Sequence, residues 1–505
     1  MGFPILGTTI SFISAPILSF CGFFLILQEQ KKLAISLFYC LLFSFGFYLF
    51  GFYWIPQTLT EFGQIPFPIN HILGVNALFV ISPHLFIFTI VNHLLKDKIL
   101  LNNFGNVLRT ILFLIIQYLT PQLFSAYPGH AWIKLAPNLG LAPIFGEYIF
   151  SFFSILISFE LGCIYRKKTF HKTNWAIFLL FIFLNYFLKN TITDSNVKNI
   201  NVRIAQANIG NNAKLSAEKG LPNSVDRVLS TYSNLSLSPS EKPIDLIIWP
   251  ETAYPFSLTS DILEKNYHQM PMVFREIIRQ TLGNIFTGGY LQNTENSFAN
   301  VYNSAFLITP DKQTQGYNKN RLLPFGESLP FSNAINETIH HIIPSISFFA
   351  KSSTSTLFNA HTLSGEEFKF IGFICYEALD PELLRDHLNS HPTMPNFLVN
   401  LTNDSWYGKT SEPEQHLFLS KWRTIEFGLP MIRSANTGIS SIVNSNGLEE
   451  KRTSIDKIEA LDYLLQVNNA PIKTIFLQFG CLPTIIISIL LLIINGLLSR
   501  KTFFK

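Results

Sequence analysis

Long runs of uncharged apolar residues lie at both ends of the chain, and they constrain its fold more than any other feature. Leu33–Trp54, His71–Leu95 and Ile475–Leu498 contain no Asp, Glu, Lys or Arg. A helix needs about 20 apolar residues to cross the hydrocarbon core of a bilayer. Four further apolar runs are Pro4–Leu27, Ile111–Phe124, Leu141–Tyr165 and Trp175–Leu188. The sequence therefore predicts a helical membrane protein whose apolar ends enclose a polar middle.

The composition supports this class and argues against a nucleic-acid partner. Charged residues make up 14% of the 505 residues, against about 25% in average soluble proteins. The net charge is only +4, which is too small for a protein that binds a phosphate backbone. We expect the basic residues to matter through their positions.

Basic residues gather in four places between or after the apolar runs. These are Lys31 and Lys32, Lys96 and Lys98, Arg166 to Lys168 with Lys172, and Arg500, Lys501 and Lys505. The positive-inside rule places such loops in the cytoplasm. The alternation then requires Pro4–Leu27 to be a hairpin of two short spans, which gives about eight spans and an outer polar domain. The expected domains are a bundle of about seven spans (1–189), an outer domain (190–471) and a last span with a basic tail (472–505).

Two carboxylates, Glu147 and Glu160, fall within the Leu141–Tyr165 run. Ionisable groups at membrane depth are expensive and often functional. A structural role between helices remains an equal alternative.

The outer domain has the pattern of a layered α/β sandwich. "NVRIAQANIG" alternates apolar and polar residues as a half-buried strand does, whereas "PIDLIIWPE" and "FKFIGFICYE" contain the continuous apolar runs of buried strands. "MVFREIIRQTL" has helical spacing. Strands interleaved with helices indicate sheets covered by helices.

Three polar residues follow apolar runs in this domain: Glu251 in "IIWPE", Lys319 in "YNKNR" and Cys375 in "GFICYE". We expect them to project from one rim of a sheet. A carboxylate can take the proton of a thiol, and an ammonium can stabilise an oxyanion, so together they suit acyl transfer. Each of the three residues also has a non-catalytic explanation, which for Cys375 is a small buried packing residue. The other cysteines lie in apolar runs, so no disulfide framework and no metal spacing is expected.

Longer motifs around these residues resemble the nitrilase (carbon–nitrogen hydrolase) superfamily. They are "IIWPETAYP", "YNKNRLLPFGESLPF", "GFICYEALDPELLR" and "LTNDSWYGKTSEPEQHLFLSKWRTIEFGLPMIRSANTGISSIVNSNG". With the apolar ends, the chain resembles the bacterial apolipoprotein N-acyltransferase family over nearly its whole length. The implied fold is a membrane bundle of about eight spans that carries a nitrilase-like α-β-β-α sandwich. Arg321, in place of a His, and the uncharged segment Gln122–Trp132 depart from the family pattern.

The resemblance implies roles for the matching residues. Glu251 would be the general base, Lys319 the cation that stabilises the oxyanion, and Cys375 the nucleophile. Glu327, Tyr376 and Glu377 would support this site. Trp406 and Tyr407 would belong to an apolar loop at the substrate entrance, and Gly146 would lie at the junction of membrane and domain.

The implied reaction moves the sn-1 acyl chain of a phospholipid through a Cys375 thioester to the α-amine of a lipoprotein's diacylglyceryl-cysteine. The expected partners are a phospholipid donor, with phosphatidylethanolamine as the candidate, a diacylated apolipoprotein and the bilayer. We expect no cofactor, a monomer, and a multi-pass protein of the bacterial inner membrane with its catalytic domain on the periplasmic side.

Two other functions stay open from the residues alone. A membrane-tethered amidase acting on a soluble amide would use the same Glu251, Lys319 and Cys375. A lipid-binding or transport protein could carry an inactive hydrolase domain, although the complete triad argues against decay.

Overall fold

The computed structural model describes residues 9–61, 63–99, 102–188, 197–259, 270–292, 301–324, 326–329, 335–336, 338 and 349–503. The chain divides into two compact units. The helical unit comprises Met1–Pro56, Phe67–Thr191 and Thr474–Lys505, and the α/β unit comprises Gln57–Pro66 and Ile192–Lys473. Both apolar ends of the chain therefore fold into the same unit.

The helical unit contains apolar helices of unequal length. Three helices in the described residues are long and apolar enough to cross a membrane, or four if one pair bent by 51° counts as a single span. The long ones are α1 (Thr9–Glu29), α2 (Leu33–Gly51) and α9 (Tyr148–Lys167), and the bent span joins α4 (Ile69–Asn76) and α5 (Leu78–Ile81) to α6 (Pro83–Leu95). The other helices are α3 (Ile55–Glu61), α7 (Asn103–Leu119), α8 (Ala142–Phe145), α10 (Lys172–Phe187), α19 (Ile475–Phe479), α20 (Leu482–Phe503) and the short 3-10 helix η1 (Pro128–Leu135).

The predicted hairpin within Pro4–Leu27 is wrong. Residues Thr9–Glu29 form one continuous helix that contains Pro16. Apolar residues flank the proline on both sides, and membrane helices tolerate proline when neighbouring groups compensate for the lost hydrogen bond. The described residues thus supply one span here where two were expected.

Glu160 in α9 and Glu147, which directly precedes this helix, are held by polar neighbours. Glu160 accepts hydrogen bonds from Asn106 of α7 (2.9 Å) and Asn174 of α10 (2.7 Å), and it pairs with His171 (2.8 Å). Glu147 accepts from Tyr118 of α7 at 2.7 Å. Buried polar groups that find partners on other helices hold a bundle in register. These contacts favour the structural role for both residues.

Two mixed sheets build the α/β unit. The first runs in the order β13 (Glu459–Asn468), β1 (Val197–Gln206), β2 (Leu246–Ile248), β4 (Asn284–Gln292), β5 (Val301–Ile308) and β6 (Thr314–Asn318), with β3 (Ser257–Leu258) beside β4. The second runs β12 (Glu449–Arg452), β11 (Ser441–Val443), β10 (Met431–Ala435), β9 (Phe397–Thr402), β8 (Glu367–Ile374) and β7 (Leu357–His361). The central strands β1, β2 and β4, and likewise β8, β9 and β10, are parallel.

Apolar side chains from both sheets meet in one core. Phe286 of the first sheet packs edge-on against Phe358 and Phe370 of the second, with ring centroids 4.9 Å apart in each pair. Such contacts bring the two sheets face to face, because each strand directs alternate side chains inward.

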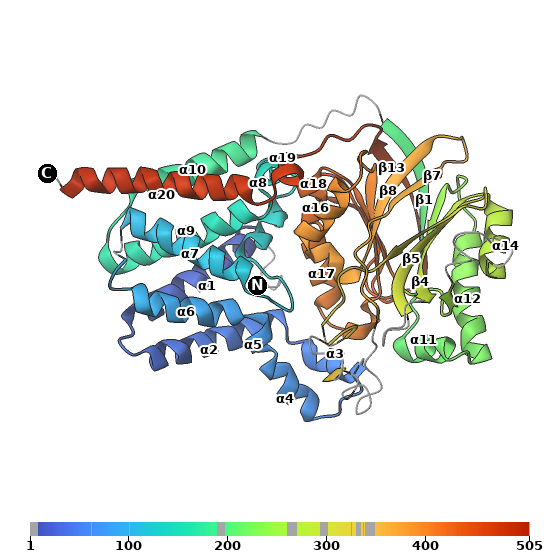
Figure 1. Ribbon diagram of the computed structural model, residues 1–505, viewed down its shortest axis with the longest axis horizontal. Helices are drawn as coiled ribbons and strands as arrows, with labels where there is room; N and C mark the ends of the chain where they lie inside the picture. The colour runs from blue at the N-terminus through green and yellow to red at the C-terminus, as the bar shows by residue number, and fades with distance from the viewer. Residues whose placement is uncertain are drawn as a thin grey trace. The chain divides into compact units, whose positions relative to one another are not determined.

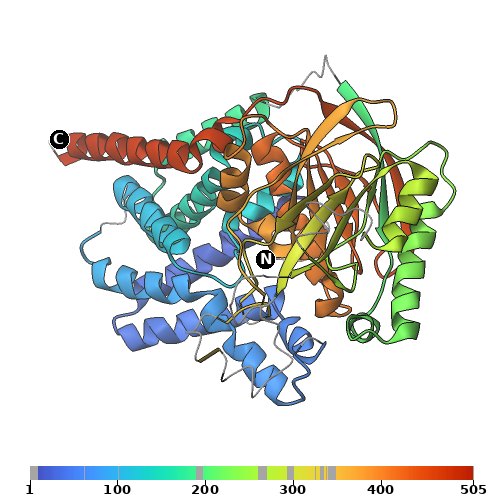
Figure 2. The same ribbon diagram turned by 45° about the vertical axis from the view of Figure 1, so that its right-hand side comes forward.

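Helices cover the outer face of each sheet. The first is covered by α11 (Asn211–Glu218), α12 (Pro222–Leu237) and α14 (Met272–Thr281), where Trp249 packs between Tyr232 and Phe274. The second is flanked by α16 (Pro381–Asn389), α17 (Glu412–Ser420) and α18 (Trp422–Phe427) on the opposite side (Figure 1), and the turned view keeps the same order of layers (Figure 2). The predicted α/β sandwich is confirmed as an α-β-β-α arrangement.

Candidate active site

The three predicted residues lie just beyond the ends of three strands. Glu251 follows β2 after two residues, Lys319 directly follows β6, and Cys375 directly follows β8. The expectation of one sheet rim needs correction, because β2 and β6 belong to the first sheet and β8 to the second. The site therefore forms where the ends of two stacked sheets meet.

Lys319 lies between two carboxylates. Its Nζ is 3.3 Å from Oε1 of Glu251 and 2.8 Å from Oε1 of Glu327, and the exposed fractions of these three side chains do not exceed 5%. Burial alone would lower the pKa of Lys319, but the two carboxylates outweigh it and raise the pKa above the ordinary value. The lysine is therefore a cation at neutral pH.

Asn303, on β5, joins the same two carboxylates. Its Nδ2 donates to Oε1 of Glu251 at 2.8 Å and to Oε1 of Glu327 at 2.9 Å. Each carboxylate thus meets the same pair of donors, one charged and one neutral. Hydrogen bonds to charged groups contribute about 1.5–3 kcal/mol each, so this amide helps to hold two like charges close together. Sequence reasoning missed Asn303.

The thiol of Cys375 is buried, and the backbone of this residue has a rare conformation. Burial and the negative charges of Glu251 and Glu327 raise the pKa of Cys375 well above its ordinary value, although Lys319 and a hydrogen bond with Thr402 oppose the rise. The thiol is therefore protonated at neutral pH, so attack requires a base at the moment of reaction. The backbone of Cys375 has a φ of +55°, a left-handed conformation that is rare outside glycine.

Glu377 connects the cysteine turn to the lysine loop. Its two carboxylate oxygens accept hydrogen bonds from the backbone N–H groups of Ile374 (2.8 Å), Asn320 (2.7 Å) and Arg321 (2.9 Å), and from the Tyr317 hydroxyl. Burial raises the pKa of Glu377, against the effects of Lys319 and these backbone donors. The carboxyl group thus bonds to the residues before Cys375 and after Lys319, so it can fix their spacing.

Tyr376 is half-buried and lies beside the buried Tyr407. The Tyr376 hydroxyl donates to Glu412, its ring stacks on His416 with centroids 4.4 Å apart, and it shares a hydrogen bond with Tyr407. Tyr407 is 1% exposed, whereas Trp406 is partly buried and lies beside Gly326. An entrance role for these two residues stays a prediction, and Tyr407 lies deeper than such a role suggested.

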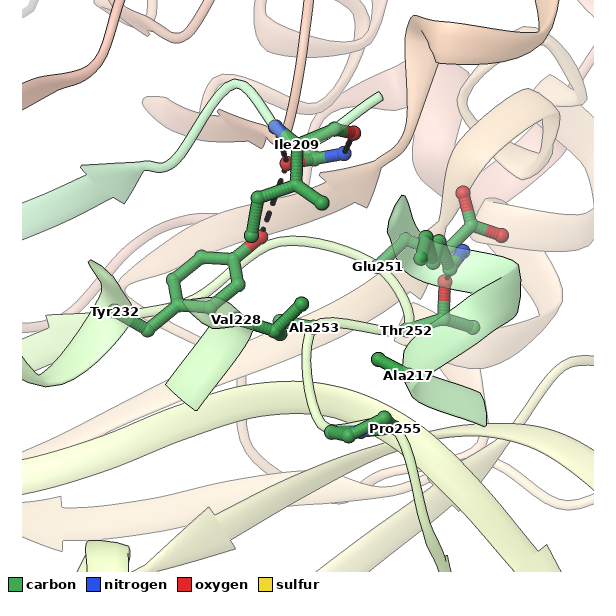
Figure 3. A pocket seen from close by; sticks show the side chains of 10 residues that line it. Ile209, Ala217, Val228, Tyr232, Glu251, Thr252, Ala253 and Pro255 are labelled. Carbon is green, nitrogen blue, oxygen red and sulfur yellow. Dashed lines mark hydrogen bonds between the residues drawn. The ribbon is translucent and has the colours of Figure 1, made fainter. Parts of the chain in front are cut away.

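A small pocket lies behind the turn that carries Glu251 (Figure 3). The backbone turn from Glu251 to Pro255, Ala217 of α11 and Tyr232 of α12 contribute to its lining. Tyr232 and the N–H of Ile209 both donate to Oδ1 of Asn436, as the dashed lines show. The described residues include no group of His, Cys, Asp or Glu side chains placed to hold a metal ion.

Packing within the helical unit explains why position 146 is a glycine. Its φ is +63°, and a Cβ at this position would lie 2.4 Å from the ring of Phe476 in α19. The ring atom belongs to a side chain that also contacts Tyr148, with centroids 5.8 Å apart. The absence of a side chain at Gly146 thus leaves room for Phe476 of α19, the first apolar helix that follows the α/β unit.

We expect Gly146→Ala to lower the melting temperature of the purified protein, because the added carbon combines backbone strain with a clash. The loss should be about 2–4 kcal/mol. Gly22→Ala is the control, since a Cβ there would meet nothing within 4 Å. Equal melting temperatures of the two variants would contradict this reading.

Comparison with known proteins gives one family match for the α/β region and one for the N-terminal helical region. The carbon-nitrogen hydrolase family model matches residues 201–453, and the model of the apolipoprotein N-acyltransferase N-terminal domain matches residues 5–159. Solved structures that match part of the chain include XC1258 from Xanthomonas campestris, a CN-hydrolase superfamily protein (14% identity, 53% of this chain and 91% of that one, TM-score 0.37), and a Nesterenkonia amidase of the nitrilase superfamily (15%, 55% and 93%, TM-score 0.37).

Relatives over nearly the full length are more informative. The apolipoprotein N-acyltransferase of Bdellovibrio bacteriovorus is 30% identical over 473 residues, which cover 90% of this chain and 83% of the relative. That of Rickettsia prowazekii is 27% identical over 493 residues, with 94% and 92% covered. Because both family models match this one chain and a relative at 30% identity is covered over 83% of its length, this protein belongs to the apolipoprotein N-acyltransferase family.

Proposed function

We propose that the chain is an N-acyltransferase that uses a Cys375 thioester to move the sn-1 acyl chain of a phospholipid onto the α-amine of a diacylated lipoprotein. The observation that carries the mechanism is the buried cluster in which Lys319 pairs with Glu251 and Glu327, beside a buried and protonated thiol. The names of the full-length relatives support the reaction class.

In the first half-reaction, the sulfur of Cys375 bonds to the ester carbonyl carbon while Glu251 takes the thiol proton. The carbon–oxygen bond then breaks, and Glu251 returns the proton to the departing lysophospholipid oxygen. In the second half-reaction, the neutral amine attacks the thioester, the carbon–sulfur bond breaks, and Glu251 carries an amine proton back to the sulfur. Lys319 stabilises the oxyanion in both steps.

Glu327, Asn303 and Glu377 would position these groups. Glu327 and Asn303 hold Lys319 and Glu251 by the contacts given above, and Glu377 fixes the turn of Cys375 against the Lys319 loop. Tyr376 would support the same turn through its contact with Glu412. Phosphatidylethanolamine is the proposed donor, and the protein is proposed to act as a monomer.

The membrane arrangement is part of the proposal. Three long apolar helices, one bent pair and three shorter apolar helices in the described residues would each cross the bilayer, which is one span fewer than the sequence suggested because α1 is continuous. Basic residues between α1 and α2, after α6 and after α9 favour a cytoplasmic side for those ends. The catalytic region (190–471), which in the sequence follows the bundle (1–189) and precedes the last span (472–505), would then be on the periplasmic side of the inner membrane.

The test uses purified protein and a phospholipid labelled in its sn-1 chain. We expect a hydroxylamine-sensitive acyl adduct, and acyl transfer when a diacylated lipopeptide with a free amine is added. Release of free fatty acid alone would favour the amidase-type alternative. Absence of both adduct and transfer would contradict the mechanism and favour an inactive lipid-binding protein.

Asn303→Leu should slow adduct formation by about 10²-fold, because it removes both hydrogen bonds that steady the two carboxylates. The control is Asn284→Leu on the neighbouring strand β4, where an equally buried amide donates only to the backbone carbonyls of Asp245 and His361. The measurement is the single-turnover rate per folded molecule. Equal rates in the two variants would show that Asn303 only supports the fold.

A further inference from the structure

The backbone carbonyl of Cys375 is held by two buried side chains. Nδ2 of Asn400, on β9, lies 3.2 Å from this oxygen, and Nε2 of His416, on α17, lies 3.3 Å from it. Both side chains have an exposed fraction of 0%. We call Asn400 and His416 the carbonyl clamp.

One arginine determines how both members of the clamp are oriented. Nη1 of Arg433, on β10, is 2.8 Å from Oδ1 of Asn400, and its Nη2 is 3.1 Å from Nδ1 of His416. A guanidinium group only donates hydrogen bonds. Asn400 must therefore present its oxygen to Arg433 and its N–H to Cys375. In the same way, His416 must accept at Nδ1 and carry its proton on Nε2, which faces the carbonyl.

The charges around the clamp keep this arrangement. Arg433 is paired with Asp404, whose carboxylate oxygens lie 3.0 and 3.2 Å from Nη2. Burial and the charge of Arg433 lower the pKa of His416 to about 4, although Asp404 opposes them. The imidazole is therefore neutral at the pH at which cells work, and it donates from one nitrogen only.

The clamp acts on a residue with a strained backbone. A non-glycine residue in the left-handed region costs of order 1–3 kcal/mol and persists only where its surroundings enforce it. At Cys375 the preceding N–H of Ile374 bonds to Glu377, and the carbonyl bonds to the clamp. These contacts fix the peptide group that follows Cys375 and the one that precedes Ile374, so they restrict the backbone turn at the cysteine and the direction of its side chain.

We propose that Asn400 and His416 are positioning residues, which hold the left-handed turn of Cys375 so that its sulfur faces Glu251 and Lys319. The inference rests on the proposed role of Cys375 as the nucleophile. Arg433 and Asp404 act one step further away, by fixing the donor direction of the clamp.

The test separates the hydrogen bond from the volume of the side chain. His416→Phe keeps an aromatic ring to stack on Tyr376 but removes the donor, whereas His416→Gln retains an N–H near the position of Nε2. We expect His416→Phe to form the acyl adduct about 10²-fold more slowly, with an unchanged KM for the lipopeptide acceptor. His416→Gln should react at close to the rate of the unaltered protein.

Asn400 supplies a second test that depends less on packing. Asn400→Asp keeps the size of the side chain and its contact with Arg433, but it loses the N–H that faces Cys375. Its matched control is Asn396→Asp, since Asn396 is buried just before the same strand and bonds to Asn468 and Lys369. We expect slow adduct formation in the first variant only.

Alkylation of Cys375 by iodoacetamide is measured in parallel on the full-length protein, and melting temperatures identify the folded variants. Alkylation should be slowed in the same variants as adduct formation. Unaltered rates in folded His416→Phe and Asn400→Asp, or equal slowing by His416→Gln and His416→Phe, would overturn the clamp. If His416→Phe does not fold, Asn400→Asp decides. If the unaltered protein forms no adduct, the proposed function fails, and the alkylation rates still test the clamp.

Discussion

We expect Cys375→Ala to form no acyl adduct with labelled phospholipid and to lose transfer activity by at least about 10⁴-fold, in line with removal of a nucleophile from other acyl-transfer sites. The substitution leaves Lys319, Glu251 and Glu327 in contact with one another, so only the atom that accepts the acyl chain is lost. The measurements are hydroxylamine-sensitive label on the protein and transfer to a diacylated lipopeptide.

The matched control is Cys163→Ala, because Cys163 is also buried but lies in the helical unit, where its sulfur contacts Asn106 at 3.3 Å. This variant should keep the adduct. An adduct of equal amount on Cys375→Ala would place the nucleophile elsewhere and contradict the mechanism.

Lys319→Met is expected to have the second largest effect, on both activity and stability. Loss of the cation leaves Glu251 and Glu327 as buried neighbours with the same charge, and breaking a buried ion pair from one side costs about 3–5 kcal/mol. The rate of adduct formation should fall by about 10²–10³-fold, which is typical for removal of one oxyanion-stabilising donor. Thermal unfolding and single-turnover rates measure the two effects.

The sign of the pH dependence follows from the raised pKa of Lys319. A raised pKa contributes stability that is fully present below the unfolded value of about 10.4 and is lost only as the pH rises through the folded value. The charge of Lys319 should therefore contribute the same stability to the unaltered protein at pH 6 and pH 8. Lys242→Met, at an exposed position, is the control and should change neither the melting temperature nor the rate of adduct formation. If Lys319→Met had an unaltered melting temperature and an unaltered rate of adduct formation, Lys319 would have no role in the site.

The ends of buried strands were the part of the site that the sequence could indicate. Glu251 and Cys375 stand where continuous apolar runs stop, and β2 and β8 do end within three residues of them. The pattern could not indicate that these strands belong to different sheets. That depends on which strands pair, and pairing joins residues far apart in the chain.

Asn303 and Asn400 show why the rest of the site stayed hidden. Asn303 occurs inside β5, next to Ser304, and Asn400 occurs inside β9. Polar residues within a strand have no sequence signal that separates a site residue from a packing residue. The role of Asn303 arises from buried contacts with Glu327 and Glu251, which are 24 and 52 positions away in the chain. That of Asn400 arises from contacts with Cys375 and Arg433. In the helical unit, Pro16 suggested a break, but flanking apolar residues continue the helix through it.

The first and last strands in the described part of the α/β unit are neighbours, with Val197 opposite Asn468 and Gln206 opposite Glu459. On its other side, β1 pairs with β2 over only three residue positions. During synthesis β1 must wait for β13, which at about 5–20 residues per second takes on the order of 10 to 50 s. Throughout this delay one edge of β1 is an unpaired template for association with other chains. A nascent chain that stalls before Glu459 therefore keeps an open sheet edge, which makes completion of the last strand the step that protects the newly made enzyme from aggregation.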